Sequence, residues 1–225
     1  MKVLQEQEDL WDHEVGLLNQ SRIDAESFVS SQSLKLREVA RGIVIKYGGR
    51  KGCAIIVGSV AWGYAKEGSD VDINYYPYKN GLIGNLAGKM GGFAEINLQH
   101  KFHNRFTKKG YDSEPVGFYY SMIDLKKHLK NAKNGGVVDT VLVNVVRLAK
   151  SGIIIGNGLT DLVSQFDEMK KDLNVEQIND AGMDRFFKFF TPIKSSVNKY
   201  VKRLEEQSQT IPESVISLRE YLKKY

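Results

Sequence analysis

The sequence predicts an α+β fold in which a small β-sheet is flanked by helices and followed by a helical C-terminal region. Residues 53–57 are apolar and residues 71–76 alternate between apolar and polar, and both patterns are typical of short strands. After residue 158 apolar residues recur at helical spacing and strand patterns nearly vanish. The strands therefore belong to the first part of the chain and helices dominate the rest.

Two helices are expected in the same part of the chain, and the first should pack beneath the sheet. The first covers residues 33–47, where Leu36, Val39 and Ile43 follow helical spacing. The second begins after Ser121, because a serine hydroxyl is a preferred N-cap.

Further elements are expected between residue 116 and the C-terminus. Residues 137–149 are almost wholly apolar, which indicates a buried helix or, as the alternative, a pair of strands. Residues 116–120 resemble a further strand. C-terminal helices are expected after a cap at Thr160 and at about residues 175–190, 191–207 and 212–224.

The composition is that of a globular protein. The chain has 225 residues, of which 42% are hydrophobic and 26% charged. No apolar run approaches the ~20 residues of a membrane span, and the acidic N-terminus lacks the order of a signal peptide, so we expect a cytoplasmic protein without a membrane partner. The single cysteine, Cys53, lies in an apolar strand and argues against a disulfide framework.

Residues 58–73 read GSVAWGYAKEGSDVDI and join a Gly-Ser turn to two carboxylates. The side-chain period of a strand puts Asp70 and Asp72 on one face, while Val71 and Ile73 face the core. Two carboxylates this close repel each other unless a cation joins them. A hard divalent ion with oxygen ligands is the natural partner, and Mg²⁺ is the first candidate.

The ungapped spacing Gly-Ser-x-Ala-x-Gly-x-Ala-x-x-x-Ser-Asp-x-Asp-Ile, from Gly58 to Ile73, resembles the signature of the compact, antibiotic-type branch of the polymerase-β-like nucleotidyltransferase superfamily. Trp62 stands where many relatives carry a basic residue. The resemblance implies a nucleotidyltransferase fold, with a small mixed β-sheet flanked by helices and a C-terminal helical bundle. It also implies transfer of a nucleoside monophosphate from a nucleoside triphosphate to an acceptor hydroxyl, with two Mg²⁺ ions, or Mn²⁺ in their place.

Three regions follow from this resemblance. Residues 1–32 would form a polar helical leader, residues 33–150 the nucleotidyltransferase catalytic domain, and residues 151–225 the C-terminal helical domain.

The resemblance assigns Asp70 and Asp72 as catalytic metal ligands and implies a third carboxylate on an adjacent strand. Glu95 is the candidate, because residues 92–98 alternate and place Glu95 on the polar face. Glu95 would complete the metal site and help to remove the proton of the acceptor.

Other residues are expected to assist. A separate carboxylate, Glu114 or Asp139, could accept the proton in place of Glu95. The nucleotide would bind at Gly58, Ser59 and Ser69, with the terminal phosphates held at the Gly-Ser turn. Arg147, near the end of the apolar segment, could add a phosphate contact.

Three kinds of function remain open at this stage. A small-molecule acceptor is favoured by the compact motif, and it would need a walled pocket between the two halves of the chain. An RNA or protein acceptor is suggested by the net charge of +5 and the basic segments 101–109 and 126–133. There Phe102 and Phe106 could stack bases, although a solvated segment with its rings tucked beneath is the favoured interpretation. A non-catalytic nucleotide-binding relative is the third.

Overall fold

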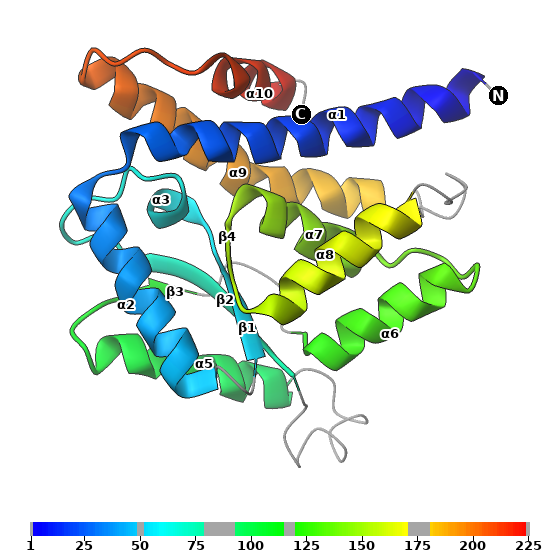
Figure 1. The fold of residues 1–225 in the computed structure, drawn as a ribbon, viewed down its shortest axis with the longest axis horizontal. Coiled ribbons are helices and arrows are strands. Elements are labelled where there is room, and N and C mark those ends of the chain that lie inside the picture. The colour runs from blue at the N-terminus through cyan, green and yellow to red at the C-terminus, as the bar shows by residue number, and fades with distance from the viewer. Residues whose placement is uncertain (1, 49–51, 79–92, 115–119, 171–180, 224–225) are drawn as a thin grey trace.

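The structure, a computed structural model, describes residues 2–48, 52–78, 93–114, 120–170 and 181–223. These residues form an α+β fold with a small mixed sheet of strand order β3-β2-β1-β4, flanked by helices (Figure 1). The strands are β1 (Gly52–Ile56), β2 (Val71–Pro77), β3 (Ser113–Glu114) and β4 (Ile153–Ile155). The helices are α1 (Lys2–Asp24), the 3-10 helix η1 (Ala25–Phe28), α2 (Ser31–Gly48), α3 (Gly58–Ala61), α5 (Phe93–Thr107), α6 (Met122–Lys133), α7 (Thr140–Ser151), α8 (Asn157–Lys170), α9 (Ala181–Glu206) and α10 (Glu213–Lys223).

The register of the sheet places the motif at one end of β2. Strand β1 runs antiparallel to both β2 and β4, so that Ala54 lies opposite Tyr75 on one side and Ile155 on the other. Strand β3 runs parallel to β2 and pairs Asp72 with Glu114. A carboxylate on each of two neighbouring strands therefore occupies the same level of the sheet.

Each face of the sheet buries its own apolar core, as the side-chain period of strands requires. One core joins alternate residues of β1 and β2 to α2, α3, α5 and α9, and its strand residues are Ala54, Ile56, Val71, Ile73 and Tyr75. The other core lies under α6, α7 and α8 and includes Cys53, Ile55, Val57 and Tyr76. The buried Cys53 acts as a small apolar side chain, as expected.

Most elements with a strong sequence pattern are confirmed. The helix expected at 33–47 is α2, and the strands expected at 53–57 and 71–76 are β1 and β2. The apolar segment after residue 137 forms helix α7 and no strand pair. Ser121 caps α6 in a capping box, since its hydroxyl accepts a hydrogen bond from the Asp124 N–H at 3.2 Å and the Asp124 carboxylate accepts one from the Ser121 N–H at 3.3 Å.

The strand expected at 92–98 is wrong, because α5 begins at Phe93. The alternation extends over a few residues only, whereas Phe102 and Phe106 continue a helical pattern and are fully buried. Tertiary packing of these rings favours the helix. Residues 115–119, which include most of the strand expected at 116–120, lie outside the described residues.

Two expectations for the C-terminal helices are also corrected. Helix α8 begins at Asn157, so Thr160 lies inside it and is not its cap. A single helix, α9, continues through Pro192 from Ala181 to Glu206, where two helices were expected.

The domain boundary expected at residue 150 falls near the end of α7. Strand β4 follows that boundary, yet it pairs with β1 in the same sheet, and α8 packs on both strands. Helix α1, which covers most of the expected leader, packs on α10 and α7, as Figure 1 shows for α10. None of the described helices combines the length and apolar character needed to cross a membrane.

Candidate active site

Three carboxylates meet where β2 begins. Asp70 immediately precedes β2, Asp72 lies on it, and Glu114 lies opposite Asp72 on β3. One oxygen of each side chain lies within 4.8 Å of the others. Ligands on opposite sides of a Mg²⁺ ion are about 4.2 Å apart, given bonds of about 2.1 Å. The spacing and the all-oxygen donor set therefore fit Mg²⁺ or Mn²⁺.

Gly58 forms the base of this cluster. Its φ of +65° lies in the left-handed region, and a Cβ on it would collide with the carboxylate of Asp72. The neighbouring Val57 N–H donates to the Asp72 carbonyl at 2.9 Å, which holds the turn against β2. The Gly-Ser turn and the Asp pair are thus packed against each other, and glycine is needed for both backbone angle and space.

We expect Gly58→Ala to weaken Mn²⁺ binding by at least about tenfold, because displacing a ligand carboxylate disturbs the metal site. Gly68→Ala is the matched control, since Gly68 also has a positive φ, +78°, but has open space where a Cβ would stand. Both variants should lose about 1 kcal/mol of stability from the left-handed backbone. Titration calorimetry with Mn²⁺ and thermal unfolding measure the two effects, and equal Mn²⁺ affinity in both variants would contradict this view of Gly58.

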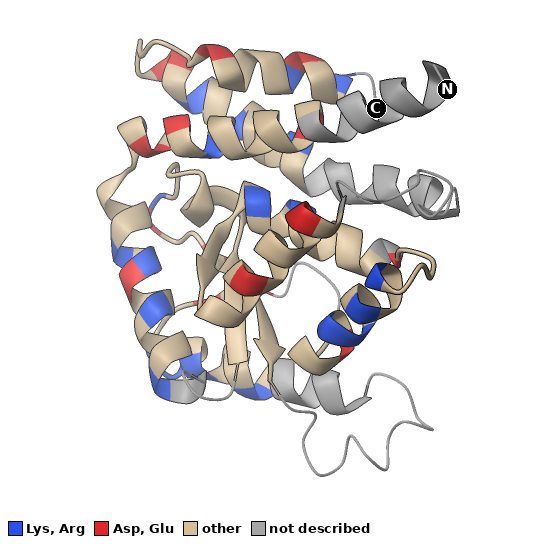
Figure 2. Ribbon diagram, turned by 45° about the vertical axis from the view of Figure 1, so that its right-hand side comes forward, with Lys and Arg blue, Asp and Glu red and all other residues tan. Residues whose placement is uncertain are grey.

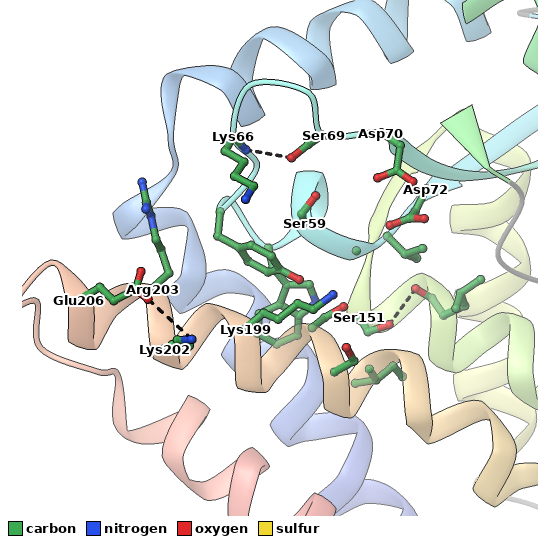
Figure 3. Close-up of a pocket in the computed structure, with 18 residues that line it drawn as sticks. Ser59, Lys66, Ser69, Asp70, Asp72, Ser151, Lys199, Lys202, Arg203 and Glu206 are labelled. Carbon is green, nitrogen blue, oxygen red and sulfur yellow. Dashed lines mark hydrogen bonds and ion pairs between the residues drawn. The ribbon is translucent and has the colours of Figure 1, made fainter. Parts of the chain in front are cut away.

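A cleft of about 540 Å³ opens between the carboxylates and α9 (Figure 3). One wall comes from the motif and includes Gly58, Ser59, Ser69, Asp70 and Asp72. The facing wall is α9, which contributes Lys199, Lys202 and Arg203. Lys66 also lies on the motif wall, and Glu206 lies on the α9 wall, where its carboxylate is 4.0 Å from the Lys202 ammonium. Both walls thus carry both signs of charge, and the aspartates with Lys199 across from them are the part suited to a metal-bound polyanion.

Burial and charge repulsion act together on Asp72. Its pKa is raised to about 6 by burial first and then by the charges of Asp70 and Glu114, while Lys199 acts in the opposite direction. Burial also raises the pKa of Tyr64 to about 12, while a hydrogen bond with the side chain of Ser196 on α9 acts to lower it. The cluster thus favours a bound cation, and the neutral Tyr64 hydroxyl links the motif to α9.

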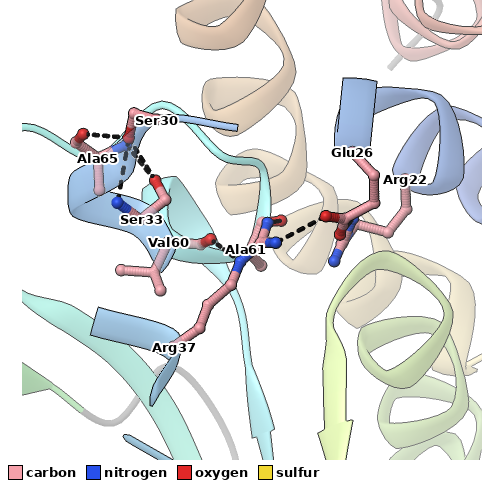
Figure 4. Close-up of polar contacts among 8 residues, drawn as sticks. All are labelled: Arg22, Glu26, Ser30, Ser33, Arg37, Val60, Ala61 and Ala65. Atoms are coloured by element: carbon pink, nitrogen blue, oxygen red, sulfur yellow. Dashed lines mark hydrogen bonds and ion pairs between the residues drawn. The ribbon is translucent and has the colours of Figure 1, made fainter. Parts of the chain in front are cut away.

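Arg37 of α2 supports the short helix α3 from behind (Figure 4). Its Nε donates to the Val60 carbonyl at 2.9 Å and its Nη2 to the Ala61 carbonyl at 2.7 Å. These carbonyls are at the C-terminal end of α3, where helices lack internal partners. Glu26 holds the guanidinium through an ion pair of 2.7 Å and also pairs with Arg22.

Two serines hold the loop that follows α3 (Figure 4). Ser30 Oγ donates to the Ala65 carbonyl at 2.7 Å, and the Ala65 N–H donates to Ser33 Oγ at 2.9 Å. Within the motif, Ser69 Oγ accepts a hydrogen bond from the Lys66 N–H at 2.9 Å. The cleft wall that carries Gly58 and Ser59 is therefore rigidly supported.

The structure brings together most of the predicted site residues. Gly58, Ser59, Ser69, Asp70 and Asp72 all line the cleft. Glu95 lies in the first turn of α5, among residues whose side chains are not described, so its role as a ligand stays a prediction. Glu114, proposed from the sequence only as a proton acceptor, holds the position beside the aspartates that was expected for Glu95.

Arg147 and Asp139 do not line the cleft. Arg147 is buried and forms a two-point ion pair with Glu14 of α1, at 2.7 and 3.2 Å. Asp139 caps α7 by accepting from the Val141 N–H at 2.8 Å, and it lies 3.1 Å from His128. The phosphate contact expected of Arg147 and the proton transfer expected of Asp139 are not supported by these positions.

The cations of α9 were missed by the sequence analysis. Lys199, Lys202 and Arg203 follow helical spacing, while Val197, Tyr200, Val201 and Leu204 are buried on the opposite side of the helix. Basic residues at helical spacing are visible in the sequence and could have indicated these cations. The spacing does not show which other element the basic face of the helix meets.

Comparison of the chain with protein-family models, with curated proteins and with solved structures found no match. The functional assignment therefore rests on the geometry of the site and on the motif.

Proposed function

We propose that this protein is a Mg²⁺-dependent nucleotidyltransferase, which transfers a nucleoside monophosphate from a nucleoside triphosphate to an acceptor hydroxyl. The observation that carries the proposal is the cluster of Asp70, Asp72 and Glu114, whose oxygens lie within 4.8 Å of one another at the edge of the cleft. The nucleotidyltransferase fold is part of this proposal.

The two walls of the cleft have complementary roles in this reaction. Asp70, Asp72 and Glu114 would hold Mg²⁺, which supplies charge neutralisation and polarisation of phosphoryl oxygens. Lys199 offsets the negative charge of the triphosphate from the α9 side, where Lys202 is paired with Glu206. Ser59 offers a hydroxyl to the phosphates from the motif side.

The proposed step is an in-line displacement at the α-phosphorus. The acceptor oxygen bonds to the α-phosphorus, the bond from that phosphorus to the bridging oxygen breaks, and pyrophosphate leaves. The proton of the acceptor hydroxyl passes to a carboxylate of the cluster, and Glu114 is the exposed member.

The direct test of the function is pyrophosphate release. The full chain is incubated with each nucleoside triphosphate, Mg²⁺ and a pool of small molecules, RNA and protein, and products are identified by mass. We expect pyrophosphate from the wild type and none from Asp72→Asn. Metal-dependent triphosphate binding without pyrophosphate would favour the non-catalytic relative, and no binding at all would overturn the proposal.

We expect Lys199→Glu to lower triphosphate affinity by about tenfold, because a cation facing the phosphates becomes an anion. Lys194→Glu is the matched control, since Lys194 lies on the same helix but does not line the cleft. Calorimetry with a nucleoside triphosphate and Mg²⁺ measures both variants. Equal losses in the two variants would show that the effect is only one of net charge.

The structure favours a small-molecule acceptor within this proposed function. A pocket between the two halves of the chain was expected, and the cleft lies between the motif and α9, a helix of the segment after residue 158. Phe102 and Phe106 are fully buried and are not available to stack bases. The lysines of α6 gather along that helix, as Figure 2 shows, and the basic residues of 101–109 belong to a different helix and the turn after it. These lysines fit the solvated face favoured in the sequence analysis.

We expect the double variant Lys108→Glu, Lys109→Glu to leave acceptor turnover unchanged, because both residues lie in the exposed turn after α5 and do not line the cleft. Binding of single-stranded RNA, measured at low and at physiological salt, provides the check. A steep salt dependence in the wild type that the variant loses would instead favour an RNA acceptor.

A further inference from the structure

Strand β3 is the shortest strand of the sheet, yet it carries a carboxylate of the proposed metal site. It consists of Ser113 and Glu114 and pairs with β2 alone among the described residues. A backbone bond from the Val71 N–H to the Asp112 carbonyl, 3.0 Å, adds to this pairing. So short an edge strand has few backbone contacts to fix its position, and a side-chain anchor would have a large effect on it.

A buried histidine supplies such an anchor. His103 of α5 places its Nδ1 2.7 Å from Ser113 Oγ, and its ring is only 9% exposed. Ser113 therefore points toward α5. Because successive side chains of a strand point to opposite faces, Glu114 points the other way, where its carboxylate meets Asp70 and Asp72.

Helix α5 is itself tightly fixed to the sheet. Phe102 stacks on Tyr75 of β2, with ring centroids 4.7 Å apart and planes 11° apart. The His103 ring meets Phe102 edge-on at 5.5 Å and lies 6.3 Å from Phe106. The imidazole thus links β3 to the same strand that carries Asp72.

We propose that His103 is a positioning residue, which acts through Ser113 to hold Glu114 beside Asp70 and Asp72. This inference rests on the proposed metal site and adds a residue from the opposite face of the sheet. His103 does not line the cleft and takes no part in the reaction itself.

Burying the His103 imidazole is unfavourable for stability, and this supports a role for His103 in positioning Glu114. Burial first, and the charge of His100 second, lower the pKa of His103 to about 4, against a hydrogen bond with the backbone of Ser113, so the ring is neutral near neutral pH. Its Nε2 is buried and has no hydrogen-bond partner among the described residues. An unsatisfied polar atom destabilises a core, so an apolar side chain would serve packing alone better. What the histidine adds is the directed bond to Ser113.

The test measures Mn²⁺ affinity of the full chain by calorimetry, with no nucleotide present. Ser113→Ala removes the hydroxyl and little packing volume, and we expect it to weaken Mn²⁺ binding by about tenfold. Ser113→Thr keeps the hydroxyl and should retain the wild-type affinity. Combining Ser113→Ala with Glu114→Gln should cause no more loss than Glu114→Gln alone, because both changes act on the same ligand.

Ser214→Ala is the control for a purely structural effect. Ser214 donates a hydrogen bond to Asp24 between α10 and α1, away from the cleft. This variant should lose stability without losing Mn²⁺ affinity. If the wild type binds Mn²⁺ and Ser113→Ala binds it equally well, the positioning role is overturned while the metal site stands. If the wild type and Asp72→Asn both fail to bind Mn²⁺, the proposed metal site itself is overturned, and this inference with it.

Discussion

Asp72→Asn is expected to abolish Mn²⁺ and triphosphate binding and, at the same time, to stabilise the metal-free protein above about pH 6. Asp72 is held against Gly58, with Asp70 and Glu114 nearby, and its pKa is raised to about 6. The charged carboxylate is therefore a cost to the folded state unless a cation offsets it. An amide has nearly the same shape, removes that cost and is a poor Mg²⁺ ligand.

The pH dependence has a definite sign. The pKa of Asp72 rises from an ordinary 3.8 to about 6 on folding, so the folded state binds the proton more tightly than the unfolded state. The free energy of unfolding in EDTA therefore falls as pH rises through this window and stays lowered above it. We expect Asp72→Asn to exceed the wild type by about 1–2 kcal/mol at about pH 8, after allowance for solvent screening, and by little at about pH 4.

Denaturant unfolding at both pH values, with EDTA or with Mn²⁺, measures this difference. Mn²⁺ should stabilise the wild type and leave Asp72→Asn unchanged, because only the wild type binds it. Glu67→Gln is the matched control, since Glu67 is an exposed carboxylate in the same loop and does not line the cleft. If the free energy of unfolding in EDTA depends on pH in the same way for Asp72→Asn and for the wild type, the charged Asp72 carboxylate does not destabilise the metal-free protein.

The part of the site that is local in sequence could be predicted from the sequence. Asp70 and Asp72 are two residues apart, so the period of a strand alone puts them on one face. The Gly-Ser turn precedes them in one ungapped segment. The φ of Gly58 is positive, and glycine adopts this backbone angle without steric cost. The expected elements around this segment, α2, β1 and β2, are accordingly present.

The part that depends on tertiary contacts could not be predicted. Strand β3 has only two residues, too few for a periodic pattern, so nothing in the sequence shows that Glu114 lies opposite Asp72. The alternation around Glu95 was stronger as a pattern, but the packing of Phe102 and Phe106 makes that segment a helix. Spacing in the sequence does not show that a two-residue strand brings Glu114 beside Asp70 and Asp72.

Arg147 illustrates the same limit for charged residues. A cation at the end of an apolar helix fits a phosphate contact as well as an ion pair, and its partner, Glu14, lies in a distant part of the chain. Only the packing of α1 on α7 distinguishes the two.

Glu14→Leu is expected to lower the free energy of unfolding by about 3–5 kcal/mol, because it removes the carboxylate that pairs with a buried guanidinium. The side chains of Arg147 and Glu14 are only 7% and 4% exposed, and two hydrogen bonds join them. Burial raises the pKa of Glu14 despite the opposing charge of Arg147, which shows how strongly this site disfavours charge. Replacing both residues, Glu14→Leu with Arg147→Met, should recover most of the loss, since no charge of the pair then remains buried.

Lys150→Met on the same helix is the control, because its ion pair with Asp167 is more exposed and should contribute less than about 1 kcal/mol. Denaturant unfolding of the single and double variants gives the coupling between Glu14 and Arg147, and calorimetry with a nucleoside triphosphate and Mg²⁺ gives the affinity of Arg147→Met. We expect strong coupling and an unchanged triphosphate affinity, because Arg147 supports the packing of α1 and does not line the cleft. Weak coupling together with a lost triphosphate affinity would instead restore Arg147 to the phosphate contact that its position in the sequence suggested.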